Sequence, residues 1–174
     1  MTERLENLIH HITTLCDPDQ LGHTRLAKIL WLSDVEFYRL SGKTVSGSDD
    51  YCKDEFGPRH RKFYDVLEHL EKSGCVARQY SPTPAGTRHE LVPLTKPDLS
   101  KFSAEEIAIV DRITALVIRR SAKKVSNDTH DELWETAYHG ERMPVAAAAP
   151  ISGELTPEIE KWATESLDAD CAPA

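Results

Sequence analysis

The chain has 174 residues, of which 40% are hydrophobic and 29% charged, and its formal net charge is −8. This length and composition predict one globular domain, and the acidity disfavours a polyphosphate partner unless the basic residues gather on one face. No apolar run approaches the roughly 20 residues of a membrane helix, and the start lacks the apolar centre of a signal peptide, so we expect no membrane contact and a cytoplasmic location.

Residues 3–16 carry apolar side chains at the spacing of a one-faced helix, which Asp17-Pro18 should end because the residue before proline is pushed out of helical geometry. His10 and His11 are adjacent on this helix and therefore point in different directions. They are not predicted to hold a metal together.

The next segment, from His23 to Gly42, has apolar residues on two sides of a helix. One stripe is Leu26, Ile29, Leu30, Phe37 and Leu40, and the other is Ala27, Trp31, Val35 and Tyr38. A helix that is apolar on both sides lies at the centre of a domain. We therefore expect the rest of the fold to be packed around it.

After a polar loop from Gly42 to Phe56, Gly57-Pro58 is predicted to open a second helix, which Gly74 closes. Short extended runs around a Pro/Gly-rich connection then predict a β-hairpin between residues 76 and 94. The expected fold class is mainly α: a compact multi-helix domain with this small hairpin between the Gly-Pro helix and the helix that follows.

Residues 102–120 form that following helix, because Ser103 and Glu106 stand at the spacing of a capping box. Its predicted buried face is Ile107, Val110, Ile113, Leu116 and Val117. Ser121 is predicted to cap a short helix through Val125, and Asp128 or Thr129 to cap a last piece that carries His130, Leu133, Trp134 and Ala137.

The chain is predicted to divide into a helical domain over residues 1–142, a linker or extended arm over 143–155, and a C-terminal helix with a frayed tail over 156–174. The middle segment reads MPVAAAAPISG up to Gly153, a run of small residues and prolines with no pattern that would bury it. Thr156-Pro157-Glu158 has the cap, proline and acid that open a helix.

Catalytic motifs are not found in the sequence: it contains no nucleophile elbow, phosphate-binding loop, H-E-x-x-H or dinucleotide fingerprint. The cysteines at 16, 52, 75 and 171 show no C-x-x-C spacing, and the acidic pairs Asp49-Asp50 and Asp54-Glu55 are typical of solvated turns. We therefore expect no enzyme activity, no cofactor and no metal.

Three motifs follow one another along the chain. The first is LAKILWLSDVEFYRLSGKTVSG over residues 26–47, followed by Tyr51; the second is FGPRHRKFYDVLEHLEKSG over 56–74; the third is the Thr129-His130 pair with Trp134. In this order they resemble the Panacea, or SocA-like, antitoxin domain. The resemblance covers roughly residues 5–140. Arg59 and His60 depart from the family pattern, in which Val often follows the Gly-Pro pair.

The resemblance implies a bacterial or prophage antitoxin that binds and neutralises a cognate toxin, with a protease as a further partner where the toxin is delivered for degradation. It also implies that some of the family's aromatic and motif residues meet the toxin. The candidate partner-binding residues are Trp31, Asp34, Tyr38, Tyr51, Phe56, Gly57, Pro58, His130 and Trp134.

One alternative of another class stays open, because two helices followed by a ribbon is also the order of a winged-helix DNA-binding domain. Against it, the second helix carries Asp65, Glu68 and Glu71, which would face phosphates. Nucleic acid is therefore the less favoured partner. The sequence does not define the oligomeric state.

Overall fold

The computed structural model describes residues 3–83, 86–120, 124 and 132–149. Helices predominate, and two small antiparallel sheets accompany them. The elements, in chain order, are α1 (Glu3–Thr14), α2 (His23–Ser41), β1 (Tyr51–Asp54), β2 (Gly57–His60), α3 (Phe63–Lys72), β3 (Val76–Thr83), β4 (Gly86–Pro93), α4 (Ala104–Ile118), α6 (Glu132–Thr136) and α7 (Val145–Ala148). None of the described helices is long and apolar enough to span a bilayer.

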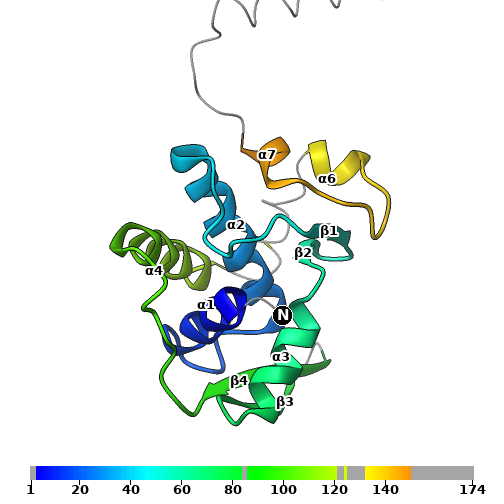
Figure 1. Ribbon diagram of the computed structural model, residues 1–174. Helices are drawn as coiled ribbons and strands as arrows, with labels where there is room; N and C mark the ends of the chain where they lie inside the picture. The colour runs from blue at the N-terminus through cyan, green and yellow to red at the C-terminus, as the bar shows by residue number, and fades with distance from the viewer. Residues whose placement is uncertain (1–2, 84–85, 121–123, 125–131, 150–174) are drawn as a thin grey trace, which may run out of the picture.

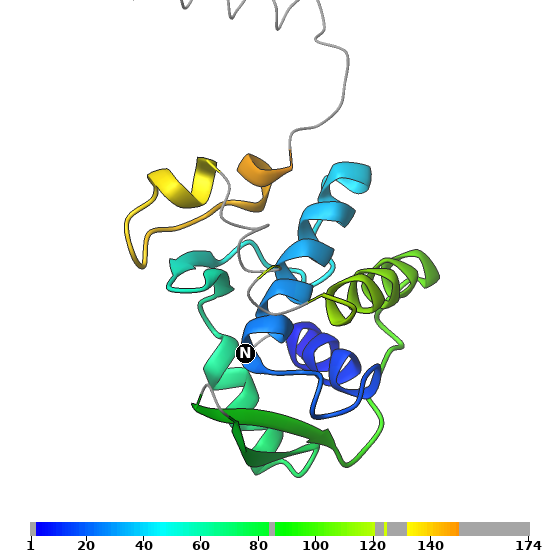
Figure 2. The same cartoon turned by 180° about the vertical axis from the view of Figure 1, so that it is seen from behind.

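Helix α2 is the central element, as its two apolar stripes predict. It packs against α1, α4, β2 and α7, and in Figures 1 and 2 it runs through the middle of the fold. Strands β3 and β4 lie with α3 at one end, whereas β1, β2, α6 and α7 lie toward the other. Leu26, Ile29 and Leu30 are fully buried, and Trp31 is nearly so.

Leu40 does not belong to the buried stripe, contrary to the prediction. Its side chain lies in the last turn of α2 and is 64% exposed. The helix ends as expected: Gly42 adopts a left-handed conformation with φ 67°, and its N–H donates to the carbonyl of Tyr38 at 2.8 Å.

The predicted Gly-Pro helix start is wrong. Gly57 has φ 108°, far from helical values, and it begins β2, which pairs with β1 in a hairpin whose register joins Tyr51 to His60 and Asp54 to Gly57. Helix α3 starts only at Phe63. A Gly-Pro pair is compatible with a helix start and with a tight hairpin. Here the pairing of β2 with residues 51–54 selects the hairpin. Strand β1 also corrects the prediction that the polar loop after α2 extends as far as Phe56.

The hairpin predicted between residues 76 and 94 is confirmed. Strands β3 and β4 pair in register from Val76 opposite Pro93 to Thr83 opposite Gly86. The base of the hairpin is closed by the N–H of Leu94, which donates to the carbonyl of Cys75 at 2.9 Å. The sheet contacts α3 through β3 and α1 through β4, so it belongs to the domain.

Helix α4 begins with the predicted capping box. The Ser103 hydroxyl accepts the N–H of Glu106 at 3.2 Å, and the Glu106 carboxylate accepts the N–H of Ser103 at 2.8 Å. The buried face is turned by about one position from the predicted one: Ile109, Val110, Ile113 and Val117 are buried, Ile107 is only half-buried, and Leu116 is 44% exposed.

This rotation gives a stability prediction. Val110→Ala should lower the free energy of unfolding by roughly 1–3 kcal/mol, because it removes buried methyl groups and leaves a cavity, whereas Leu116→Ala should change it by less than about 0.5 kcal/mol. Urea unfolding followed by circular dichroism measures both. Equal losses in the two variants would contradict the observed orientation of α4.

Residues 143–149 pack on the domain, which corrects the prediction that a linker begins at 143. Met143 and Val145 are fully buried, and Ala149 is 1% exposed. The N–H of Met143 donates to the carbonyl of Tyr51 at 2.9 Å, and α7 contacts α2. Several predictions lie outside the described residues: His130, the helix at 121–125 apart from residue 124, the remainder of the linker, and the C-terminal helix.

Candidate partner-binding site

A buried carboxylate on α2 holds together the segment that carries most of the candidate residues. Asp34 has no exposed surface, and it accepts the N–H of Ser46 at 2.8 Å, the hydroxyl of Ser46, and the hydroxyl of Tyr51 at 2.7 Å. Burial raises the pKa of Asp34 to about 6, against the effect of these hydrogen bonds. A single side chain of α2 thus fixes both the loop after the helix and the first residue of β1.

The loop between α2 and β1 needs glycine at Gly47. This residue has φ 72°, and a Cβ there would lie 3.0 Å from Cδ of Arg4 on α1. Arg4 in turn donates to the carbonyl of Val45 at 2.8 Å. The V-S-G part of the motif therefore has three distinct tasks: Val45 is buried, Ser46 binds Asp34, and Gly47 permits the close approach to α1.

The β1–β2 hairpin is fastened by polar contacts at both ends. At the tip, Arg59 forms an ion pair with Asp54 across the strands, and the guanidinium lies 4.8 Å from the ring centroid of Tyr64. At the base, the buried imidazole of His60 is hydrogen-bonded to the hydroxyl of Ser48 at 3.0 Å. The two residues that depart from the family pattern, Arg59 and His60, therefore both hold the hairpin in place.

Helix α6 is docked on the same hairpin by Trp134. Its indole N–H donates to the carbonyl of Asp54 at 3.2 Å, and the ammonium of Lys53 lies 4.1 Å from the indole centroid. Lys53 also donates to the carbonyl of Ala137 at 3.0 Å. The third sequence motif thus contacts β1, the strand just before the second motif, although 80 residues separate Trp134 from Asp54 in the chain.

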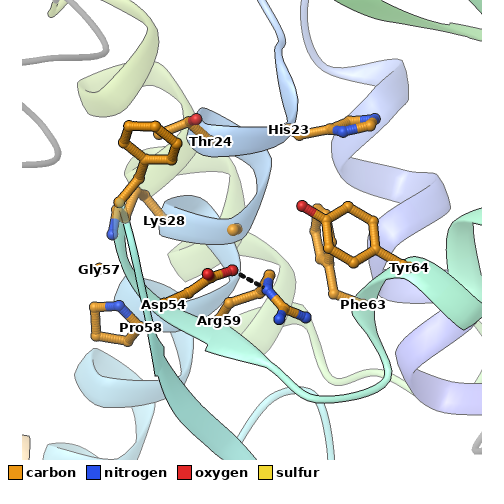
Figure 3. A pocket seen from close by; sticks show the side chains of 11 residues that line it. His23, Thr24, Lys28, Asp54, Gly57, Pro58, Arg59, Phe63 and Tyr64 are labelled. Carbon is orange, nitrogen blue, oxygen red and sulfur yellow. Dashed lines mark hydrogen bonds and ion pairs between the residues drawn. The ribbon is translucent and has the colours of Figure 1, made fainter. Parts of the chain in front are cut away.

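A pocket of about 170 Å³ lies between the start of α2, the tip of the hairpin and the start of α3. Figure 3 shows Lys28, Asp54 and Arg59 there, with the rings of Phe63 and Tyr64 close by. The lining residues are His23, Thr24, Ala27, Lys28, Asp54, Phe56, Gly57, Pro58, Arg59, Phe63 and Tyr64.

Lys28 is the unusual member of this pocket. Its side chain is 1% exposed, and its Nζ atom has no hydrogen-bond partner within the described part of the chain. Burial lowers the pKa of the ammonium from 10.5 to about 7, and the charge of Asp54 opposes this shift. Burying an ammonium group without a counter-charge lowers the free energy of unfolding.

The predicted site residues divide into two groups. Trp31, Asp34 and Tyr51 are enclosed in the core, where the rings of Trp31 and Tyr51 meet edge to face at 4.9 Å. They stabilise the fold beneath the site and do not themselves offer surface to a partner, because they are 0–2% exposed. Gly57 and Pro58 lie on the pocket but are themselves buried.

The predicted residues with accessible surface are fewer. Phe56, at the hairpin tip, is 56% exposed, while Trp134 and Tyr38 are half-buried; Tyr38 lines a separate open depression over the loop after α2. The sequence reasoning missed Lys28 and Tyr64 as site residues. For Lys28 the signal was present, because it is a cation between the apolar neighbours Ala27 and Ile29 in the first motif, on a doubly apolar helix.

The residues that the structure describes contain no group of three His, Cys, Asp or Glu side chains placed to hold a metal ion. The predicted independence of His10 and His11 agrees with their contacts. His10 is hydrogen-bonded to the carbonyl of Thr95 at 3.0 Å, and His11 to the carboxylate of Asp111 at 2.9 Å.

Residues 26–135 match the family described as antitoxin SocA-like, Panacea domain. The chain belongs to this family. The matched region of this Panacea domain runs from α2 through the hairpin and α4 into α6, so it includes the Asp34 cluster and every residue that lines the pocket except His23 and Thr24. Helix α1 and residues 143–149 lie outside the match, yet they complete the core around α2. No curated protein and no solved structure shows a significant match to the chain.

Proposed function

We propose that this Panacea domain is an antitoxin that neutralises a cognate protein toxin by direct binding, and that it acts without catalysis. The family match supports the general role. The surface that carries the proposal is the hairpin tip with its adjoining pocket, which we call the tip surface and define as Phe56, Pro58, Arg59, Tyr64 and Lys28.

The tip surface has the features of a protein-binding site. Phe56 and Tyr64 are large side chains that are 56% and 51% exposed, and both line the pocket, together with apolar residues such as Ala27 and Phe63. Aromatic residues beside a pocket are frequent sources of binding energy at protein interfaces. The backbone beneath them is held by the Asp54–Arg59 ion pair and by Trp134, so little ordering of the hairpin is needed on binding.

The mechanism that follows is occlusion of the toxin by a rigid tip. Delivery of the bound toxin to a protease is a further role that the same complex would allow, and it needs a second surface. Cytoplasmic action is part of the proposal, since the toxin is expected to be encoded and neutralised in the same cell.

The DNA-binding alternative is less favoured by the local charges. On α3 the exposed face carries Asp65 and Glu68, and Glu71 is paired with Arg78 of β3 at 3.2 Å. A helix of this kind would bring carboxylates toward phosphates, and one of the few cations of the ribbon is already engaged.

Co-expression with the protein from the neighbouring reading frame tests the proposal. If that protein inhibits growth, this chain should restore growth and co-purify with it. Phe56→Ala combined with Tyr64→Ala should weaken binding at least about tenfold, because two interface aromatics are removed. Leu94→Ala is the matched control, since Leu94 is 57% exposed at the base of the β3–β4 hairpin and does not line the pocket.

The outcomes separate the two functions. Growth inhibition that this chain fails to relieve, or binding that the double variant leaves unchanged, would contradict antitoxin action through the tip surface. Retention of duplex DNA on a filter, falling steeply as salt is raised, would favour the regulator instead.

A further inference from the structure

The pocket of the tip surface holds a cation that lacks a counter-charge. The Nζ atom of Lys28 is buried without a hydrogen bond in the described structure, in a helix whose neighbouring positions Ala27 and Ile29 are apolar and buried. Removing an ammonium from water without a partner is costly, so a merely structural position would favour a residue such as Met or Leu.

The nearby acid does not neutralise Lys28. Asp54 forms an ion pair with Arg59 through one oxygen and accepts the N–H of Glu55 at 2.9 Å through the other. The hydrogen bond from Arg59 keeps the pKa of Asp54 below its usual value despite burial, so this carboxylate is ionised and already engaged.

From this geometry we infer that the pocket receives a carboxylate side chain, Asp or Glu, of the bound partner protein, which pairs with the ammonium of Lys28. The inference rests on the proposed function, because it names the anchor by which a toxin would engage the tip surface. The long lysine side chain must turn its covered Nζ toward the pocket, a rotation about its last bonds.

Size and charge both favour a single carboxylate. A pocket of about 170 Å³ accepts the end of one side chain, and one free ammonium balances one negative charge, whereas a phosphate dianion would also meet Asp54. A chain-terminal carboxylate is usually held by several backbone N–H groups. At this tip the N–H of Glu55 is occupied by Asp54.

Binding should therefore depend on pH in a defined direction. The other titratable groups that line the pocket are His23 on α2, Asp54 and Arg59 of the hairpin, and the phenol of Tyr64 on α3. Burial lowers the pKa of His23 to about 4, so His23 is neutral throughout the neutral range, and the Asp54–Arg59 pair is charged throughout it. Lys28 is then the pocket group that titrates near neutrality, and affinity for a carboxylate should fall as the pH rises above about 7.

The test uses the full chain and short capped peptides, so no toxin is required. The side-chain NMR signals of Lys28 are titrated with acetyl-Ala-Glu-Ala-amide, with acetyl-Ala-Gln-Ala-amide, and with acetyl-Ala-Ala-Ala bearing a free carboxyl end, at equal ionic strength. The Glu peptide should raise the pKa of Lys28 by about one unit or more and should saturate, because a contacting opposite charge favours the ammonium. The Gln peptide should leave it unchanged.

Variants distinguish a binding role from a structural one. Lys28→Met should abolish binding of the Glu peptide and raise the urea midpoint of the free protein, since the uncompensated charge is gone. Lys72→Met on α3, where Lys72 is exposed and paired with Glu68, removes the same charge and should keep peptide binding.

Three results would overturn the inference: no shift with the Glu peptide, the same shift with the Gln peptide, or a shift only with the free carboxyl end. If the Glu peptide binds through Lys28 but the chain relieves no toxin, the carboxylate pocket stands and the antitoxin role fails. If the chain relieves a toxin and Lys28→Met does so equally well, the antitoxin role stands and the anchor fails.

Discussion

Asp34→Ala is expected to lower the free energy of unfolding by about 3–5 kcal/mol, because it leaves the N–H of Ser46 and the hydroxyl of Tyr51 buried without an acceptor and takes from the Ser46 hydroxyl one of its two acceptors. The loop after α2 and the start of β1 should loosen together, since both are held by this carboxylate. Urea unfolding measures the loss, and hydrogen exchange at Ser46 measures the local opening.

Asp65→Ala is the control for that experiment, because Asp65 is an exposed acid on α3. Its expected effect is within about 0.5 kcal/mol. A loss of similar size in both variants would show that the Asp34 cluster contributes no more than a surface charge does. Asp34→Asn should lie between the two, since its amide retains one acceptor.

The raised pKa of Asp34 gives the same cluster a pH dependence. The folded protein holds this proton more tightly than the unfolded chain does, because the pKa rises from 3.8 to about 6 on folding. The resulting contribution to stability is fully present below about pH 4 and is lost as the pH rises through about 6. The free energy of unfolding of the parent, relative to that of Asp34→Asn, should therefore fall by about 3 kcal/mol as the pH rises through this window. A difference that stays constant from pH 4 to about 7 would contradict the shift.

Trp31→Ala is the second change with a large expected effect, about 3–5 kcal/mol of stability. Trp31 is 2% exposed at the centre of α2, and the change removes its edge-to-face contact with Tyr51 along with its buried area. Thermal unfolding followed by circular dichroism provides the measurement. Trp31→Phe should cost less because it keeps an aromatic ring there.

Leu40→Ala provides the comparison on the same helix. Leu40 is 64% exposed, so its removal should change stability by less than about 0.5 kcal/mol. If Trp31→Ala folded as stably as the parent but lost toxin binding, Trp31 would be a contact residue after all. The burial of its ring would then have to be relieved in the complex.

Local sequence patterns determined the parts of this fold that depend on nearby residues. The capping box at Ser103 and Glu106 closes within one helical turn, and Gly42 ends α2 by its own backbone conformation. The two stripes of α2 identified the central helix for the same reason, because helical periodicity is fixed by the backbone. The order of the three motifs was also evident from the sequence, and the resemblance it indicated agrees with the family match over residues 26–135.

The tertiary structure decided what depends on distant partners. Gly57-Pro58 became a strand because residues 51–54 pair with it, and residues 143–149 became core because they meet Tyr51 and α2. Leu116 and Leu40 fit a helical stripe by spacing, yet their side chains are 44% and 64% exposed. Burial also decides which motif residues lie in the core beneath the site and which are accessible to a partner. Burial depends on what the rest of the chain places beside each side chain. The sequence contained Lys28, but only the packing of the hairpin against α2 and α3 leaves its ammonium enclosed and without a counter-charge.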